Sequence, residues 1–172
     1  MMTDTEAVLV ANMEINVLID EGFEGNLEIS WLRNVVEQAL IALDPGSEVE
    51  LGLVITSQEK IRELNRSYRS KDEPTDVLAF AMRPAEPTPG ADSPPFIAPP
   101  DGVLHLGEVI ISYPQAVIQA EEQQHSVKRE IAILIIHGLL HLLGYEHETH
   151  EQKQLMSAKE TEILSHLEKE LS

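Results

Sequence analysis

The stretch His137-Gly138-Leu139-Leu140-His141-Leu142-Leu143-Gly144-Tyr145-Glu146-His147 holds three of the seven histidines in the chain. His137 and His141 are four residues apart, so on an α-helix both imidazoles project from one face, one turn apart. Gly144 is a natural end for that helix, because glycine takes the left-handed backbone conformation without steric cost. A turn there can return His147 to the helical pair. Three neutral imidazoles with an open fourth position form a catalytic zinc site, so we predict one divalent ion, zinc, on His137, His141 and His147.

The spacing His-x3-His-x2-Gly-x2-His is also that of the metzincin proteases, but the residue after the first histidine differs. Those enzymes carry a glutamate there as the general base of peptide hydrolysis, whereas this chain has Gly138. A lone histidine on an apolar helix is more often a buried structural residue than a ligand. The third histidine, just beyond a glycine helix end, favours a metal site over that alternative.

The length of 172 residues suggests a single domain, 1–172, which can bury a substantial core without covalent staples. The chain has no cysteine, which excludes disulfides and thiolate metal ligands and is compatible with a reducing cytoplasm. Its amino end lacks the pattern of a signal peptide. The longest apolar segment, residues 131–145, is too short to cross a bilayer. We therefore expect a cytoplasmic protein without a membrane partner.

The formal net charge of −18 disfavours non-specific attraction to nucleic acid, so we expect no DNA partner. The basic residues are unevenly spread, however. Five of the twelve lie within residues 60–71, namely Lys60, Arg62, Arg66, Arg69 and Lys71. An acidic protein can still present such a cluster as a local basic groove. The alternative is an ordinary solvated helix face, and composition alone does not separate the two.

Alternating apolar residues predict strands at 13–19 and 49–55, and apolar runs predict two more at 76–82 and 103–112. Helical patterns begin at residues that suit helix starts: Ser30, Ser57, Pro114, Ser126 and Thr149. The central helix, residues 127–143, carries the first two histidines. In the last helix we predict an apolar stripe that includes Leu155, Met156, Ile163, Leu164 and Leu167. These elements favour an α/β (α+β-like) fold, with about five helices on a single-layer mixed sheet of about four strands.

Residues 83–102 hold seven of the ten prolines and interrupt the strand pattern. We interpret them as a surface loop rather than a linker between domains, because neither flank looks complete alone. A partner-binding polyproline motif is the alternative, and the inert loop is the favoured interpretation.

Three blocks of the sequence together resemble one known family. The first is His137-Gly138-x-Leu140-His141-Leu142-x-Gly144-Tyr145-x-His147. The second is Leu64-Asn65-Arg66-Ser67-Tyr68-Arg69-Ser70-Lys71-Asp72-Glu73-Pro74-Thr75-Asp76-Val77-Leu78, and the third is Leu106-Gly107-Glu108-Val109-Ile110-Ile111-Ser112. They resemble the YbeY family, bacterial metal-dependent endoribonucleases of ribosomal RNA maturation. The chain departs from the family pattern at Glu108 and Glu146, where aspartate is common, and at Ala79 and Ala81.

The resemblance implies a small α/β fold, a zinc-type ion and cleavage of single-stranded RNA. It also implies association with the small ribosomal subunit, in ribosomal RNA maturation and ribosome quality control. Arg69 would then be catalytic, holding the scissile phosphate through its bidentate guanidinium. Arg66 and Lys71 would bind the RNA backbone as substrate-binding residues. The alternative for Arg69 is a surface ion pair with a neighbouring aspartate.

Several assignments stay open from sequence alone. Glu146 either orients His147, accepts a proton or is a plain solvent-facing carboxylate, and no general base is assigned. His105 and His150 are not expected to be ligands, because the fourth metal position must stay open. The alternatives to a nuclease are a zinc-binding ribosome-assembly factor without catalysis and a metzincin-like or small-molecule metallohydrolase.

Overall fold

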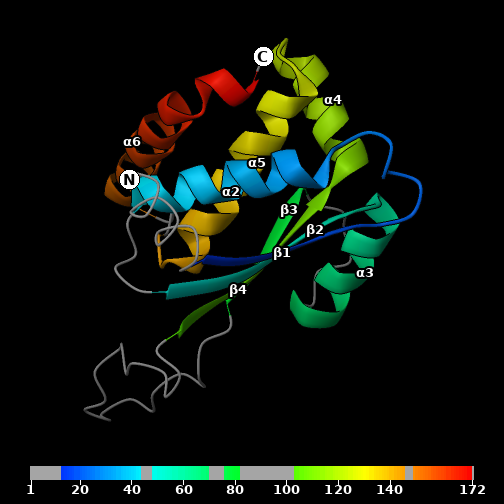
Figure 1. The fold of residues 1–172 in the computed structure, drawn as a ribbon, viewed down its shortest axis with the longest axis horizontal. Coiled ribbons are helices and arrows are strands. Elements are labelled where there is room, and N and C mark those ends of the chain that lie inside the picture. The colour runs from blue at the N-terminus through cyan, green and yellow to red at the C-terminus, as the bar shows by residue number, and fades with distance from the viewer. Residues whose placement is uncertain (1–12, 44–47, 70–75, 82–102, 146–148, 172) are drawn as a thin grey trace, which may run out of the picture.

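The structure, a computed structural model, describes residues 13–43, 48–69, 76–81, 103–145 and 149–171. Within these ranges five α-helices and one four-stranded sheet form an α/β fold (Figure 1). In chain order the elements are β1 (Met13–Ile19), α2 (Ile29–Leu43), β2 (Glu48–Thr56), α3 (Gln58–Arg69), β3 (Val77–Ala81), β4 (Val103–Ser112), α4 (Tyr113–Gln123), α5 (Val127–Leu142), α6 (His150–His166) and the 3-10 turn η1 (Glu168–Leu171). The predicted fold class is confirmed. The predicted proline-rich loop at 83–102 lies outside the described residues.

The sheet has the strand order β1-β2-β4-β3. Strands β1, β2 and β4 run parallel, and β3 lies antiparallel to β4 at the edge, so the predicted mixed sheet is confirmed. The register between β2 and β4 shifts at Glu50 and Leu51, where Leu106 is the extra residue and Gly107 has a φ of 125°. Only glycine takes that conformation without strain, which explains its place in this bulge.

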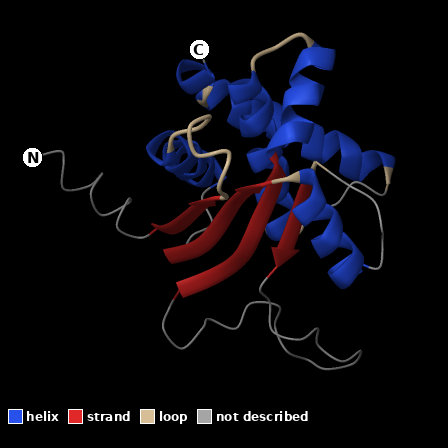
Figure 2. Ribbon diagram, turned by 90° about the vertical axis from the view of Figure 1, so that its right-hand side faces the viewer, coloured by secondary structure: helices blue, strands red, loops and turns tan. Residues whose placement is uncertain are grey.

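The larger core lies on one face of the sheet, to which α2, α4, α5 and α6 all contribute side chains. Figure 2 shows the strands as one twisted layer beneath most of the helices. Ten of the sixteen residues of α5 are buried, which is the pattern of a helix enclosed by the core on nearly every side. The partly exposed residues between 131 and 142 are Ile133, His137 and His141, which recur every four residues and so form one stripe. The most buried helix of the fold therefore opens to solvent along its histidines.

The opposite face of the sheet carries α3. Its Ile61 is fully buried against Leu78 of β3 and Ile110 of β4, in a second, smaller core. Both α3 and α5 contact the edge strand β3, from opposite faces. This strand therefore separates the basic helix from the histidine-bearing helix. No helix in the described part of the chain is long and apolar enough to cross a membrane.

Most of the predicted helix starts are confirmed by cap geometry. The Ser57, Ser126 and Thr149 side chains accept hydrogen bonds from backbone amides three residues later, and Pro114 lies in the first turn of α4. Ser30 is wrong as a cap, because α2 begins at Ile29 and its first bond runs from the Leu32 amide to the Glu28 carbonyl, 3.1 Å. Leu155 is wrong as a core residue of α6, since it is 62% exposed.

Candidate metal and RNA site

The histidine pair has the geometry that the helical spacing predicted. The His137 and His141 Nε2 atoms are 3.1 Å apart, and the ring centroids are 4.6 Å apart with an interplanar angle of 76°. Two ligand nitrogens at 2.0–2.1 Å from a tetrahedral zinc ion would be separated by about 3.3 Å. The separation of the two Nε2 atoms is therefore close to that of adjacent corners of such a site.

The helix α5 ends in a turn at Gly144. The Gly144 amide donates to the His141 carbonyl at 3.0 Å, and the Tyr145 amide donates to the Leu140 carbonyl at 2.9 Å. This is the Schellman ending, and it needs the left-handed φ of 99° that Gly144 adopts. The predicted third ligand, His147, lies outside the described residues, as does Glu146. Within the described ranges there is no group of three side chains that could hold a metal.

Gly138 shows why no protease base follows the first histidine. A Cβ atom at this position would lie 2.7 Å from Cγ1 and 3.0 Å from Cγ2 of Val109 on β4. Position 138 therefore faces the sheet, where α5 and β4 approach too closely for a side chain. A glutamate there would meet Val109 rather than a substrate, so the metzincin-like mechanism does not fit this helix packing.

Sequence reasoning missed Glu160. Its Oε2 lies 3.1 Å from Nδ1 of His137, and both side chains are about one-third exposed. Glu160 lies on the same stripe as the buried Met156 and Ile163 of α6 and the buried Leu167 at its end, which packs into the larger core. The sequence does carry a signal for it: residues 156, 160, 163 and 167 follow one another at steps of four, three and four, and Glu160 is the one charged residue among them.

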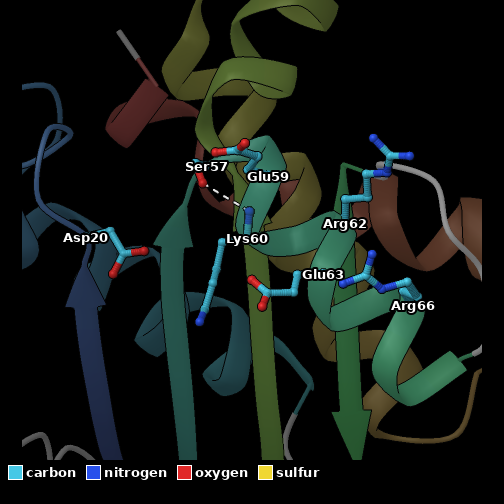
Figure 3. Close-up of a pocket in the computed structure, with 7 residues that line it drawn as sticks. All are labelled: Asp20, Ser57, Glu59, Lys60, Arg62, Glu63 and Arg66. Carbon is cyan, nitrogen blue, oxygen red and sulfur yellow. Dashed lines mark hydrogen bonds between the residues drawn. The ribbon is translucent and has the colours of Figure 1, made fainter.

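Three basic residues of α3, Lys60, Arg62 and Arg66, line an open pocket of about 680 Å³ (Figure 3). Arg62 and Arg66 lie four residues apart on one side of the helix, whereas Lys60 and Glu63 lie nearer Asp20 at the end of β1 (Figure 3). Its lining alternates in charge: Asp20, Ser57, Glu59, Lys60, Arg62, Glu63 and Arg66. This pocket is therefore a mixed surface rather than the uniformly basic groove that the sequence allowed.

The predicted RNA-contacting residues occupy the carboxyl-terminal half of α3 and the segment after it. Arg66 lies on the face of the sheet opposite the histidine pair, so the structure does not bring these residues into contact. Arg69 is the last residue of α3, and its side chain lies outside what the structure describes. Lys71 also lies outside the described residues. The helix that carries Arg66 packs on β3, on the face of the sheet opposite α5.

Two other histidines make structural pairs. Nδ1 of His105 lies 2.6 Å from Oε1 of Glu50, and Nε2 of His125 lies 2.7 Å from Oε1 of the buried Glu130. Glu50 also faces Glu14 on the neighbouring strand. A hydrogen bond with Glu50, reinforced by the negative charge of that carboxyl, raises the pKa of Glu14 above its ordinary value. Glu14, Glu50 and His105 lie on strands β1, β2 and β4, and His125 and Glu130 lie just before α5 and in its first turn, so neither pair is beside His137 and His141.

Comparison with known proteins decides the family. The family described as endoribonuclease YbeY matches residues 20–168, which is most of the chain. The chain belongs to the endoribonuclease YbeY family. The Endoribonuclease YbeY of Dehalococcoides mccartyi is 44% identical over 160 residues, covering 93% of each chain. That of Pelotomaculum thermopropionicum is 41% identical over 160 residues, covering 93% of this chain and 96% of the relative.

A solved structure supports the fold of this YbeY-family chain. The solution structure of a Thermotoga maritima protein superimposes with a TM-score of 0.58 at 23% identity, covering 89% of this chain and 88% of that one. The resemblance predicted from the three sequence blocks is thereby confirmed at the level of family and fold. All six predicted site residues fall inside the span that the YbeY family matches: Arg66, Arg69, Lys71, His137, His141 and His147.

Proposed function

We propose that this YbeY-family protein is a zinc-dependent endoribonuclease. It would cleave single-stranded RNA in ribosomal RNA maturation and ribosome quality control, in the cytoplasm and in association with the small ribosomal subunit. We expect neither DNA nor a membrane as a partner. The observation that carries it is the 3.1 Å separation of the His137 and His141 Nε2 atoms, in a chain whose relatives are named endoribonucleases.

In the proposed site, His137, His141 and His147 hold the ion through neutral imidazole nitrogens. A bound zinc ion supplies a water of lowered pKa and polarises a phosphoryl oxygen. The partly exposed stripe of α5 keeps the Nε2 atoms within reach of a substrate. No general base is assigned, and position 138 does not supply one, because it faces β4. A metzincin-like hydrolase is not favoured, since position 138 packs on Val109.

Arg69 is proposed to bind the scissile phosphate. A guanidinium donates two parallel hydrogen bonds to phosphate oxygens and offsets the charge that develops during cleavage. Arg66 and Lys71, one on each side of it in sequence, would hold the backbone of the flanking nucleotides. The supporting observation is that α3 packs on β3, which α5 contacts from the other face.

The test compares Arg69→Glu with Arg69→Lys in a single-stranded RNA cleavage assay, with metal content measured on the same samples. We expect Arg69→Glu to lower kcat by at least about 100-fold, which is typical for loss of a transition-state donor. Arg69→Lys should be intermediate, because it keeps the charge and loses the bidentate fork. Metal content should stay near that of the wild type in both.

Arg62→Glu is the matched control, because it makes the same charge change two turns earlier on the same helix. We expect it to raise KM more than it lowers kcat. Wild-type kcat in Arg69→Glu would show that Arg69 is only a surface ion pair, and casein cleavage in place of RNA cleavage would overturn the nuclease assignment.

A further inference from the structure

The contact between Glu160 and His137 joins two helices at the proposed metal site. Glu160 lies in the third turn of α6, while His137 lies in the third turn of α5. Met156 and Ile163, on either side of Glu160 along its stripe, are 2% and 0% exposed. These two flanking apolar residues anchor α6 in the core, so the carboxylate is held against the imidazole by the packing of the helices.

The chemistry of this contact selects one form of the imidazole. An ionised carboxylate only accepts hydrogen bonds, so Nδ1 of His137 must carry the proton and donate it to Glu160. In a neutral imidazole the other nitrogen, Nε2, is then unprotonated and presents its lone pair. It is the Nε2 atom that lies 3.1 Å from Nε2 of His141. The carboxylate thus prepares the nitrogen that faces the proposed metal position.

Glu160 is placed to orient a ligand and not to be one. It contacts Nδ1, whereas the two histidines approach each other through Nε2, on a different edge of the ring. A small cavity of about 150 Å³ between α5 and α6 also has Glu160 in its wall, together with Ile133, Ile136, Ser157, Thr161 and Leu164. Three of these lining residues are apolar, and the Thr161 hydroxyl already donates to the Ser157 carbonyl, which limits competing hydrogen-bond partners for the carboxylate.

We propose that Glu160 is a positioning residue that fixes the tautomer and ring orientation of His137 and thereby raises metal affinity. This inference rests on the metal site proposed above and adds a role for a residue outside the three histidines. Carboxylates that hold the second nitrogen of a metal-bound histidine typically change metal affinity by about 10–100-fold. The pair also couples the docking of α6 to the metal site.

The experiment titrates metal-free full-length protein with Co²⁺ and, in competition with a chromophoric chelator, with Zn²⁺. Wild type, Glu160→Ala, Glu160→Gln and Glu162→Gln are compared by affinity and by the visible spectrum of the cobalt form. Glu162 is the matched control, because it is exposed on the same helix and pairs with Lys159 at 3.5 Å. Urea denaturation of each metal-free variant is measured in parallel.

We expect Glu160→Ala to weaken Co²⁺ and Zn²⁺ binding by about 10–100-fold. Glu160→Gln should lie between Glu160→Ala and wild type with an unchanged cobalt spectrum, because an amide oxygen still accepts from Nδ1. Glu162→Gln should match the wild type. Should Glu160→Ala not fold, Glu160→Gln still tests the proposal, through a measurable loss of affinity.

Three results would overturn the inference. Wild-type affinity in both Glu160 variants would show that the contact serves only to dock α6, and lowered metal-free stability alone would show the same. Complete loss of binding in both variants with an altered cobalt spectrum would make Glu160 a direct ligand. If the wild type itself bound no Co²⁺, the proposed metal site would fail and this inference with it. If the wild type binds Co²⁺ and both Glu160 variants bind it equally well, the inference about Glu160 fails while the proposed metal site stands.

Discussion

Gly138 shows how one residue constrains both packing and chemistry. It lets α5 approach β4 so closely that Val109 occupies the space of a Cβ atom. The same approach places His137 and His141 on the partly exposed side of the helix, away from the sheet. Gly138 therefore stands where a protease would carry its base, and it also lets α5 lie close to β4 with both histidines on the other side of the helix.

Gly138→Ala should destabilise the protein by about 1–3 kcal/mol, because the added methyl group overpacks a buried contact. Helix propensity acts in the opposite direction by about 1 kcal/mol. Urea denaturation of Gly138→Ala, Val109→Ala and the double variant measures the balance. The double variant should be more stable than the sum of the single changes predicts, since a smaller residue at 109 makes room. A Gly138→Ala protein more stable than wild type would contradict the close approach.

Glu14 is a residue whose charge opposes the fold at neutral pH. Its pKa is raised by the hydrogen bond and by the negative charge of Glu50 across the strand pair. A carboxyl that binds its proton more tightly in the folded chain adds stability below its ordinary pKa. That contribution is lost as the pH rises through the raised value.

Glu14→Gln should therefore raise the urea midpoint at neutral pH, and the gain should disappear below about pH 3, where the wild-type carboxyl is protonated in both states. Glu48→Gln on β2 makes the same change in net charge and serves as the control for the overall charge of −18. Equal effects of the two variants at every pH would mean that the Glu14–Glu50 pair has no specific role.

At the scale of elements, α6 matters because it delivers Glu160 to α5. It starts with a capping box, in which the Thr149 side chain accepts from the Gln152 amide at 3.1 Å and the Gln152 side chain accepts from the Thr149 amide at 3.0 Å. Both bonds satisfy amides that a helix start leaves without partners. The position of this start fixes which residues of α6 face α5.

Thr149→Ala should lower the free energy of unfolding by about 0.5–2 kcal/mol, the usual cost of losing such a cap. Thr161→Ala is the control, because Thr161 is exposed within the same helix and its hydroxyl only donates to the Ser157 carbonyl. We expect the control to change stability by less than about 0.5 kcal/mol. Thermal or urea denaturation checks both, and equal values for the two variants would contradict the cap.

Helix starts could be predicted from neighbouring residues, whereas the buried side of a helix depends on how other helices pack against it. Ser57, Ser126 and Thr149 were identified because a cap depends on a residue and its neighbours three positions on. Leu155 was misassigned because the buried stripe of α6 is set by the direction in which α5 approaches it. The place of Glu160 in the apolar stripe was visible in the sequence, but its contact with His137 was not, since the two residues are 23 positions apart.

For the whole molecule, the sheet order decides what lies together. The alternating patterns predicted four strands and a mixed sheet, but the insertion of β4 between β2 and β3 depends on pairing between distant segments. That order places α3 and α5 on opposite faces, with the edge strand β3 between them. The i, i+4 histidine pair was predictable because its geometry is contained within one helix. The position of Arg66 relative to that pair was not predictable, because it depends on the order of the strands.

The central claim, a metal held by the histidines that is required for RNA cleavage, has one most direct test. Single-stranded RNA cleavage and metal content are measured together on wild type as purified, after chelation and after return of one equivalent of Zn²⁺, and on His141→Ala. We predict that chelation abolishes cleavage, that Zn²⁺ restores it, and that His141→Ala stays folded but neither holds the ion nor cleaves RNA. Full cleavage by chelated protein shown to be free of metal would contradict the account.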